Sequence, residues 1–167
     1  VEYGLDLLEN LGMDCIHDRV RCLTGWLLQE LAALRHPNGA PVVRIYGPGT
    51  TERRGGTVTL NFYDANGHFI DHPVIERRAG EHRISLRTGC FCNPGAGELA
   101  LGLSKGELFH CMREVGENVA HITYEDFRRC IDDKSTGAVR ISFGWASTFA
   151  DAEAFLAFAR EMRAPAT

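Results

Sequence analysis

A long amphipathic helix is the feature that most constrains what this chain can fold into. Five apolar side chains recur at helical spacing within residues 13–35: Val20, Leu23, Leu27, Leu31 and Leu34. This stripe predicts a helix with one buried face, roughly 35 Å long at 1.5 Å per residue. Gly12 is expected to separate it from a shorter helix before it, and the turn sequence "HPNGAP" at 36–41 to end it.

The rest of the chain mixes strand and helix patterns. Strands are predicted where β-branched or alternating residues gather, at 42–46, 57–63, 83–87 and 137–144. Helices are predicted at 72–82, 104–115, 123–131 and 151–162. The order favours an α+β layer: a small, mostly antiparallel sheet of three to five strands with helices on one face, preceded by the long helix.

Composition excludes several classes of protein. Apolar residues make up 44% of the chain and charged residues 24%, as in ordinary globular proteins. The formal charge of −4 provides no basic field for nucleic acid, and no apolar run approaches the roughly 20 residues of a membrane span. The first residues carry no basic signal-peptide region. We therefore expect a cytoplasmic protein, and the missing initial Met suggests a piece of a longer one.

Two cysteines stand one residue apart in "RTGCFCNPGAG", residues 87–97. Zinc sites favour C-x2-C pairs, and His82, His110 and Cys111 would complete a site here only by tertiary accident, so no metal is expected. A disulfide between Cys90 and Cys92 would close a very tight ring. A nucleophile fits better, because a neighbouring cation such as Arg87 favours the thiolate. A loop thiol without a role remains the alternative.

The other four cysteines have a simpler interpretation. The chain is long enough to form a core and lacks a secretory signal, so reduced thiols are expected rather than a disulfide framework. Buried free cysteine behaves as a small apolar residue. We expect this role for Cys15, Cys22, Cys111 and Cys130.

The "NPGAG" that follows Cys92 is expected to form an irregular exposed turn.

Three stretches resemble one family of enzymes. "ISLRTGCFCNPGA", "HPNGAPVVRIY" and "TGAVRISFGWASTFADAEAFLAF" are similar in order to the molybdenum cofactor sulfurases. These belong to the class V aminotransferase and cysteine desulfurase group of pyridoxal-phosphate enzymes, which share fold type I. The resemblance implies that residues 36–167 form the C-terminal small domain of that fold. Residues 1–35 would be the helical segment that leads into it.

The resemblance also implies a mechanism. These enzymes take sulfur from L-cysteine as a protein persulfide, and the sulfurases pass it to the molybdenum cofactor. The desulfurase pattern Arg-x-Gly-x-x-Cys makes Cys92 the persulfide carrier and Arg87 its upstream arginine. Cys90 is the second choice, where desulfurases often carry histidine. Arg140 falls on the arginine that binds the substrate carboxylate, a role for which a bidentate guanidinium is suited. The alternative for Arg140 is a surface arginine on an edge strand.

The chain departs from the family in its lysines. Pyridoxal phosphate binds covalently to a lysine in these enzymes, but this chain has only Lys105 and Lys134, and neither lies in the family's motif. We therefore expect no covalent cofactor here and a chain inactive alone. Its partners would be the pyridoxal-phosphate-binding large domain, L-cysteine, and molybdenum cofactor or a molybdoenzyme, in a homodimeric parent. Alternatives are another class V lyase, a cysteine desulfurase, or a stand-alone sulfur-carrier or metal-binding module.

Overall fold

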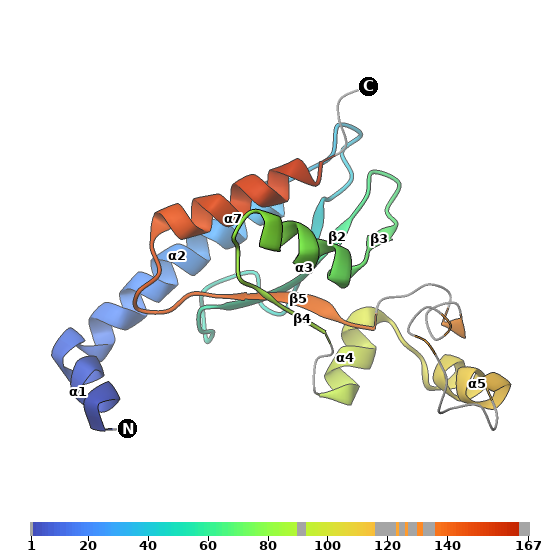
Figure 1. Cartoon of the computed structure of the whole chain (residues 1–167), viewed down its shortest axis with the longest axis horizontal. Coiled ribbons are helices and arrows are strands. Elements are labelled where there is room, and N and C mark those ends of the chain that lie inside the picture. The colour runs from blue at the N-terminus through green and yellow to red at the C-terminus, as the bar shows by residue number, and fades with distance from the viewer. Residues whose placement is uncertain are drawn as a thin grey trace.

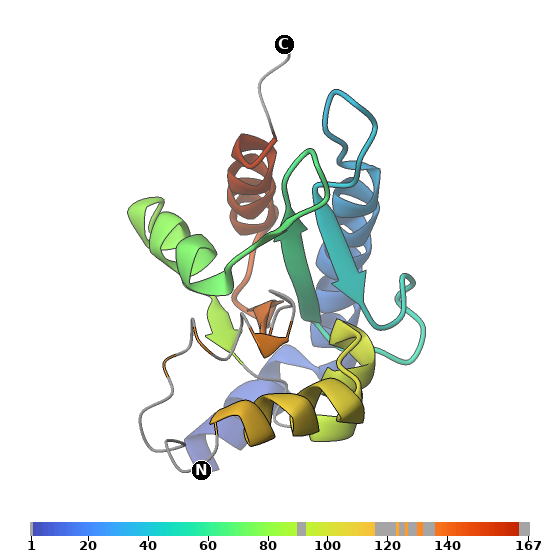
Figure 2. The same cartoon turned by 90° about the vertical axis from the view of Figure 1, so that its right-hand side faces the viewer.

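The computed structural model describes residues 2–89, 93–115, 123, 126, 130, 131 and 136–163. Its described part has two layers (Figure 1): one face of an antiparallel sheet is covered by three helices, and α4 lies on the other side of the strands. Figure 2 shows two of the covering helices, one near each end of the chain, side by side behind the strands. The expected α+β class, with helices on one face of a small sheet, is confirmed.

The N-terminal helices match the sequence pattern. Helix α1 spans Glu2–Leu11 and α2 spans Met13–Ala33. Gly12 separates them with φ of +81°, a conformation that glycine adopts without the steric cost of a Cβ. The predicted break is therefore confirmed. Helix α1 buries none of its residues, whereas α2 buries most of its leucine stripe against the rest of the domain.

In the described part of the chain, five strands form one sheet. They are β1 (Val43–Tyr46), β2 (Thr57–Tyr63), β3 (Phe69–Ile70), β4 (Arg87–Gly89) and β5 (Ala138–Ser142). The order is β1-β2-β5-β4, every pairing is antiparallel, and β3 pairs with β2. The prediction missed β3, which adds only two residues. It also started β4 too early, because the turn that ends the preceding helix includes Arg83, with φ of +58°, and the amide of Ile84.

The remaining helices are mostly those predicted. They are α3 (His72–Glu81), α4 (Pro94–Leu101), α5 (Lys105–Val115) and α7 (Phe149–Glu161). Helix α4 was not predicted, and the irregular turn expected at "NPGAG" is wrong. Asn93 caps this helix by accepting a hydrogen bond from the Ala96 amide at 3.3 Å, and Pro94 fits its first turn. The helix predicted at 123–131 falls mostly outside the described residues.

The core lies between the sheet and helices α2, α3 and α7. Alternate residues of β2 point into it, namely Val58, Leu60 and Phe62, each fully buried. Phe62 meets Phe158 of α7 edge-to-face, with ring centroids 6.0 Å apart. Such pairs add to the stabilisation from burial alone. Among the described residues, no helix combines the length and the apolar character that a membrane crossing requires.

Candidate functional site

The sheet face opposite the core carries a row of polar side chains. Strand pairing places Tyr46, Thr59, Arg140 and Arg87 side by side, one from each of four strands. Directly paired residues of antiparallel strands share a face, with Cα atoms about 4.5–5.5 Å apart. Arg87 and Arg140 are therefore immediate neighbours. Strand β5 lies between β2 and β4, so Arg140 is not on an edge strand.

The two arginines form an uncompensated pair. Both are exposed, and neither has a hydrogen-bond or ion-pair partner in the part of the chain that the structure describes. Like charges that face each other directly across two strands destabilise a sheet. A bound anion would relieve this repulsion, and a carboxylate suits the planar donors of guanidinium. This face can therefore hold an anionic group between β4 and β5.

A contact with α3 fixes the direction in which β4 faces. The Thr88 hydroxyl donates a hydrogen bond to a carboxylate oxygen of Glu76 on α3, at 2.6 Å. Since successive side chains alternate across a strand, Arg87 on one side of Thr88 points away from α3. The anchor thus holds Arg87 on the open face, three residues before Cys90.

Two glycines let β4 and β5 approach closely where the cysteine loop begins. Gly89 has φ of +120°. A Cβ placed on Gly137 would lie 2.7 Å from the Gly89 carbonyl oxygen, so only glycine fits there without a backbone shift. Cys90 and Cys92 follow directly but lie outside the described residues. The structure therefore places both ends of their loop, Gly89 and Asn93, and not the thiols themselves.

The row of Tyr46, Thr59, Arg140 and Arg87, here called the arginine row, has a buried asparagine beside the hydroxyl of its tyrosine. Asn61 is fully buried, and its side-chain nitrogen donates to the Tyr46 hydroxyl and to the Gly137 carbonyl, each at 3.1 Å. Burial, and next the neighbouring Tyr63, hold the pKa of Tyr46 above its usual range. Tyr46 is thus a neutral hydroxyl at physiological pH. Sequence analysis missed these residues, although the alternation of β2 already placed Thr59 and Asn61 on one face.

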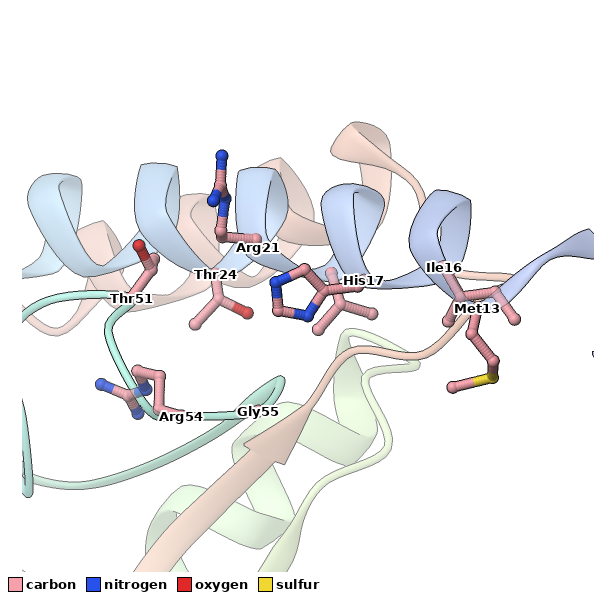
Figure 3. Close-up of a pocket in the computed structure, with 9 residues that line it drawn as sticks. Met13, Ile16, His17, Arg21, Thr24, Thr51, Arg54 and Gly55 are labelled. Atoms are coloured by element: carbon pink, nitrogen blue, oxygen red, sulfur yellow. The ribbon is translucent and has the colours of Figure 1, made fainter.

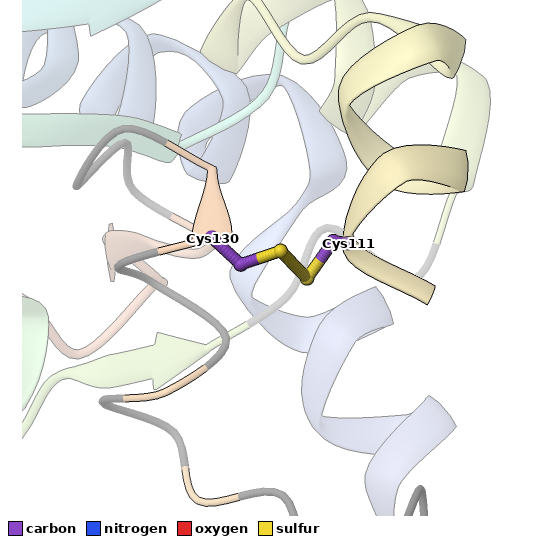
Figure 4. The surroundings of a disulfide bond; sticks show 2 residues. All are labelled: Cys111 and Cys130. Atoms are coloured by element: carbon purple, nitrogen blue, oxygen red, sulfur yellow. A yellow bond between two sulfur atoms is a disulfide. The ribbon is translucent and has the colours of Figure 1, made fainter. Parts of the chain in front are cut away.

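The four remaining cysteines contradict the sequence prediction. Cys111 is buried as expected, but it forms a disulfide with Cys130, with Cα atoms 5.3 Å apart (Figure 4). Cys15 and Cys22 are free and exposed rather than part of the core. They are seven residues apart on α2 and lie beside the leucine stripe, not on it. The pairing cannot be obtained from helical spacing, whereas the position of Cys15 and Cys22 off the stripe could have predicted their exposure.

The described residues do not suit a covalently bound pyridoxal phosphate. Lys105, at the start of α5, is exposed and lies outside the arginine row, and Lys134 is outside the described part. Within that part, no group of three or more His, Cys, Asp or Glu residues is arranged to hold a metal ion. The chemistry that the sheet face with Arg87 and Arg140 can support is thus the binding of an anion beside the cysteine loop.

Comparisons with known proteins give a consistent set of relatives. No family model matches the chain. The molybdenum cofactor sulfurase of Bos taurus is 39% identical over 163 residues, covering 95% of this chain and 18% of that protein. That of Arabidopsis thaliana is 39% identical over 162 residues, covering 95% and 19%. The human sulfurase is 37% identical over 171 residues, covering 98% and 18%. The chain thus spans less than a fifth of the length of these relatives.

A solved structure shares the fold. The cysteine desulfurase CsdA of Escherichia coli aligns with a TM-score of 0.55 at 16% identity, over 95% of this chain and 28% of that one. At this identity the likeness shows the fold alone. It confirms the expected architecture, that of one part of a cysteine desulfurase.

Proposed function

Because the chain is homologous to part of the molybdenum cofactor sulfurases, we propose that it is the C-terminal small domain of such a sulfurase. In this proposal Cys92 accepts sulfur from L-cysteine as a persulfide and passes it to the molybdenum cofactor. The chain is inactive alone, since the lysine that holds pyridoxal phosphate lies on the large domain of the parent protein or of a partner chain. Residues 1–35 lead from that domain into residues 36–167.

The observation that carries the proposal is the Arg87–Arg140 pair directly before the cysteine loop. Arg140 binds the substrate carboxylate through two parallel hydrogen bonds. Arg87, on the neighbouring strand, adds positive charge at the base of the loop. Positive charge favours the thiolate form of a cysteine. One pair of strands thus holds the substrate and prepares its acceptor.

The sulfur transfer balances without an added oxidant. The C–S bond of L-cysteine breaks, an S–S bond to the Cys92 thiolate forms, and the thiol proton of the substrate ends on the carbon that becomes the methyl group of alanine. Pyridoxal phosphate, when bound by the parent, supplies the electron sink for C–S cleavage. The contributions of this chain are to hold the carboxylate, to keep the acceptor ionised and to carry the sulfur away.

Mass spectrometry of the parent enzyme after L-cysteine treatment tests the assignment. We expect the added sulfur on Cys92, its retention in Cys90→Ser and its loss in Cys92→Ser. Cys22→Ser is the control, because Cys22 is a free, exposed thiol that lies on α2 rather than in the cysteine loop. Sulfur on Cys90, or full sulfur transfer by Cys92→Ser, would show that the register taken from the desulfurase pattern is wrong.

The named relatives favour a sulfurase over a simple desulfurase. The sulfurases match at 37–39% identity over nearly the whole chain, whereas CsdA matches at 16%. The acceptor of the sulfur distinguishes the two activities. We expect the persulfide-loaded parent to transfer its sulfur to molybdenum cofactor, and release of sulfide without any such transfer would favour the desulfurase.

A further inference from the structure

A cavity of about 200 Å³ lies between the first half of α2 and the loop that joins β1 to β2. Figure 3 shows Thr24 and His17 projecting from α2 toward the loop residues Arg54 and Gly55, whereas Arg21 points away. None of its lining residues belongs to the arginine row of the sheet. The cavity is therefore a separate feature from the site described above.

Two polar atoms at this cavity are buried and have no hydrogen-bond partner among the residues that the structure describes. They are the Thr24 hydroxyl and the Arg54 Nε, and Thr24 is only 1% exposed. The other Arg54 nitrogens hold the loop by donating to the carbonyls of Pro48 and, at 2.7 Å, Thr57. The guanidinium is thus fixed in place, and its buried Nε–H donor is unused. Buried donors without a partner are rare in proteins, and each calls for an acceptor.

The rest of the lining separates into a cationic part and an apolar part. His17, Arg21 and Arg54 are basic or ionisable, and none of the described residues that line the cavity is acidic. Met13, Ile16 and Val20 form an apolar wall, spaced so that they share one side of α2. Val20 is the one member of the predicted stripe that is not fully buried, because it faces this cavity.

The cavity walls are held together by a close contact. A Cβ placed on Gly56 would lie 2.5 Å from the Phe143 carbonyl oxygen and 2.8 Å from Val20 Cγ1. The Phe143 amide also donates to the Gly56 carbonyl at 2.9 Å. The loop is therefore pressed against both α2 and the end of β5. This packing forms the cavity before any ligand arrives.

We propose that this cavity binds a small organic anion. Its oxyanion accepts hydrogen bonds from the Thr24 hydroxyl and the Arg54 Nε, and its apolar body lies along Met13, Ile16 and Val20. A cavity of about 150 Å³ holds a benzene molecule, so there is room for an aromatic or short aliphatic body with one charged group. The site is independent of the proposed sulfur transfer.

The probe is 4-fluorobenzoate, followed by ¹⁹F and ¹⁵N NMR on the 167-residue chain, with 4-fluorobenzamide as the uncharged analogue of the same shape. We expect saturable binding of the benzoate, with amide shifts concentrated in residues 13–24 and 51–56. The benzamide should bind at least about tenfold more weakly, since hydrogen bonds to a charged group are the stronger ones. 4-Fluorophenyl phosphate then shows whether a carboxylate or a phosphate is preferred.

Two variants test the geometry. Thr24→Val keeps the side-chain shape and removes the hydroxyl, and should weaken benzoate binding by about twofold to tenfold while leaving the protein folded. Arg77→Gln removes an exposed charge on α3 that does not line the cavity, and should leave binding unchanged. Three results would overturn the proposal: no saturable shifts, equal binding of benzoate and benzamide, or equal weakening by both variants.

Discussion

The two faces of β2 differ in whether other parts of the chain cover them. On one face, Val58, Leu60 and Phe62 are fully buried by helices of the same chain. On the other, Thr59 stands in a row with Arg87 and Arg140, whose charges no described residue compensates. On the first face, helices of the same chain bury the apolar side chains. On the second, the charges of the arginine pair have no counter-ion among the described residues, and a bound anion would supply one.

This difference separates residues that stabilise the fold from residues available for chemistry. Burial of apolar side chains is the main stabilising contribution to a domain. Adjacent like charges destabilise a sheet. An exposed pair of arginines on neighbouring strands is therefore better explained by a role in binding than by a role in stability. Substitutions on the two faces should accordingly affect different measurements.

The largest effect is expected on the core face. Phe62→Ala removes a fully buried ring that contacts Phe158, and should lower the free energy of unfolding by about 3–5 kcal/mol. Thr59→Ala, three residues away on the open face, should lower it by less than about 1 kcal/mol. Urea denaturation of both variants measures the contrast. Equal losses would mean that the two faces are not energetically distinct.

The open face should respond in activity instead. Arg140→Lys keeps the charge and loses the bidentate geometry, so the parent enzyme should lose at least about tenfold in kcat/KM for L-cysteine. Its unfolding free energy should change by no more than about 0.5 kcal/mol. Arg44→Lys is the matched control, since Arg44 is exposed on the same face but stacks on Tyr46 at 5.5 Å. Unchanged kinetics in Arg140→Lys would exclude its role with the carboxylate.

Gly137 packs closely against Gly89, where the cysteine loop begins. Its substitution should therefore affect both the unfolding free energy and the activity of the parent enzyme. The added methyl group in Gly137→Ala would collide with the Gly89 backbone, at a cost of about 1–3 kcal/mol in unfolding free energy. It should also displace the start of the cysteine loop and slow persulfide formation in the parent. Gly80→Ala is the control, because a Cβ there meets nothing within 4 Å. Normal sulfur transfer by Gly137→Ala would show that this close approach does not position the loop.

The core face could be predicted from sequence because apolar periodicity reports burial directly. The alternation of β2 and the stripe of α2 gave the correct elements and most of the buried residues. Helix α4 escaped prediction because "NPGAG" is rich in turn-forming residues, although Asn93 and Pro94 are also a helix cap and a first-turn proline. Local signals of this kind favour a turn and a helix start equally.

The open face could be predicted only in part. Motif resemblance singled out Arg87 and Arg140, but not their direct pairing, because register between distant strands is set by tertiary packing. The Cys111–Cys130 disulfide was missed for a similar reason, since spacing along the chain does not determine which thiols meet. The cavity beside Thr24 likewise depends on where the β1–β2 loop packs.

The smallest expected effect on stability comes from the N-terminal cap of α7, the helix that covers part of the core face. Thr148 caps α7: its hydroxyl accepts from the Asp151 amide at 3.3 Å, and the Asp151 carboxylate accepts from the Thr148 amide at 2.8 Å. Thr148→Ala should cost about 1 kcal/mol of unfolding free energy at pH 7. The cost should appear in the unfolding free energy and leave anion binding on the open face unchanged.

The pH dependence of stability separates the contribution of the Asp151 carboxylate from that of the Thr148 hydroxyl in this cap. Hydrogen bonds from the Thr148 amide, and next from its hydroxyl, hold the pKa of Asp151 below its usual range. A carboxyl whose pKa is lower in the folded state stabilises the protein above its unfolded pKa of about 4 and loses that contribution as the pH falls through the folded value. The stability difference between the natural chain and Asp151→Asn should therefore shrink below about pH 4. A difference that stays constant down to pH 3 in urea titrations would show that the charge of Asp151 does not contribute to the cap.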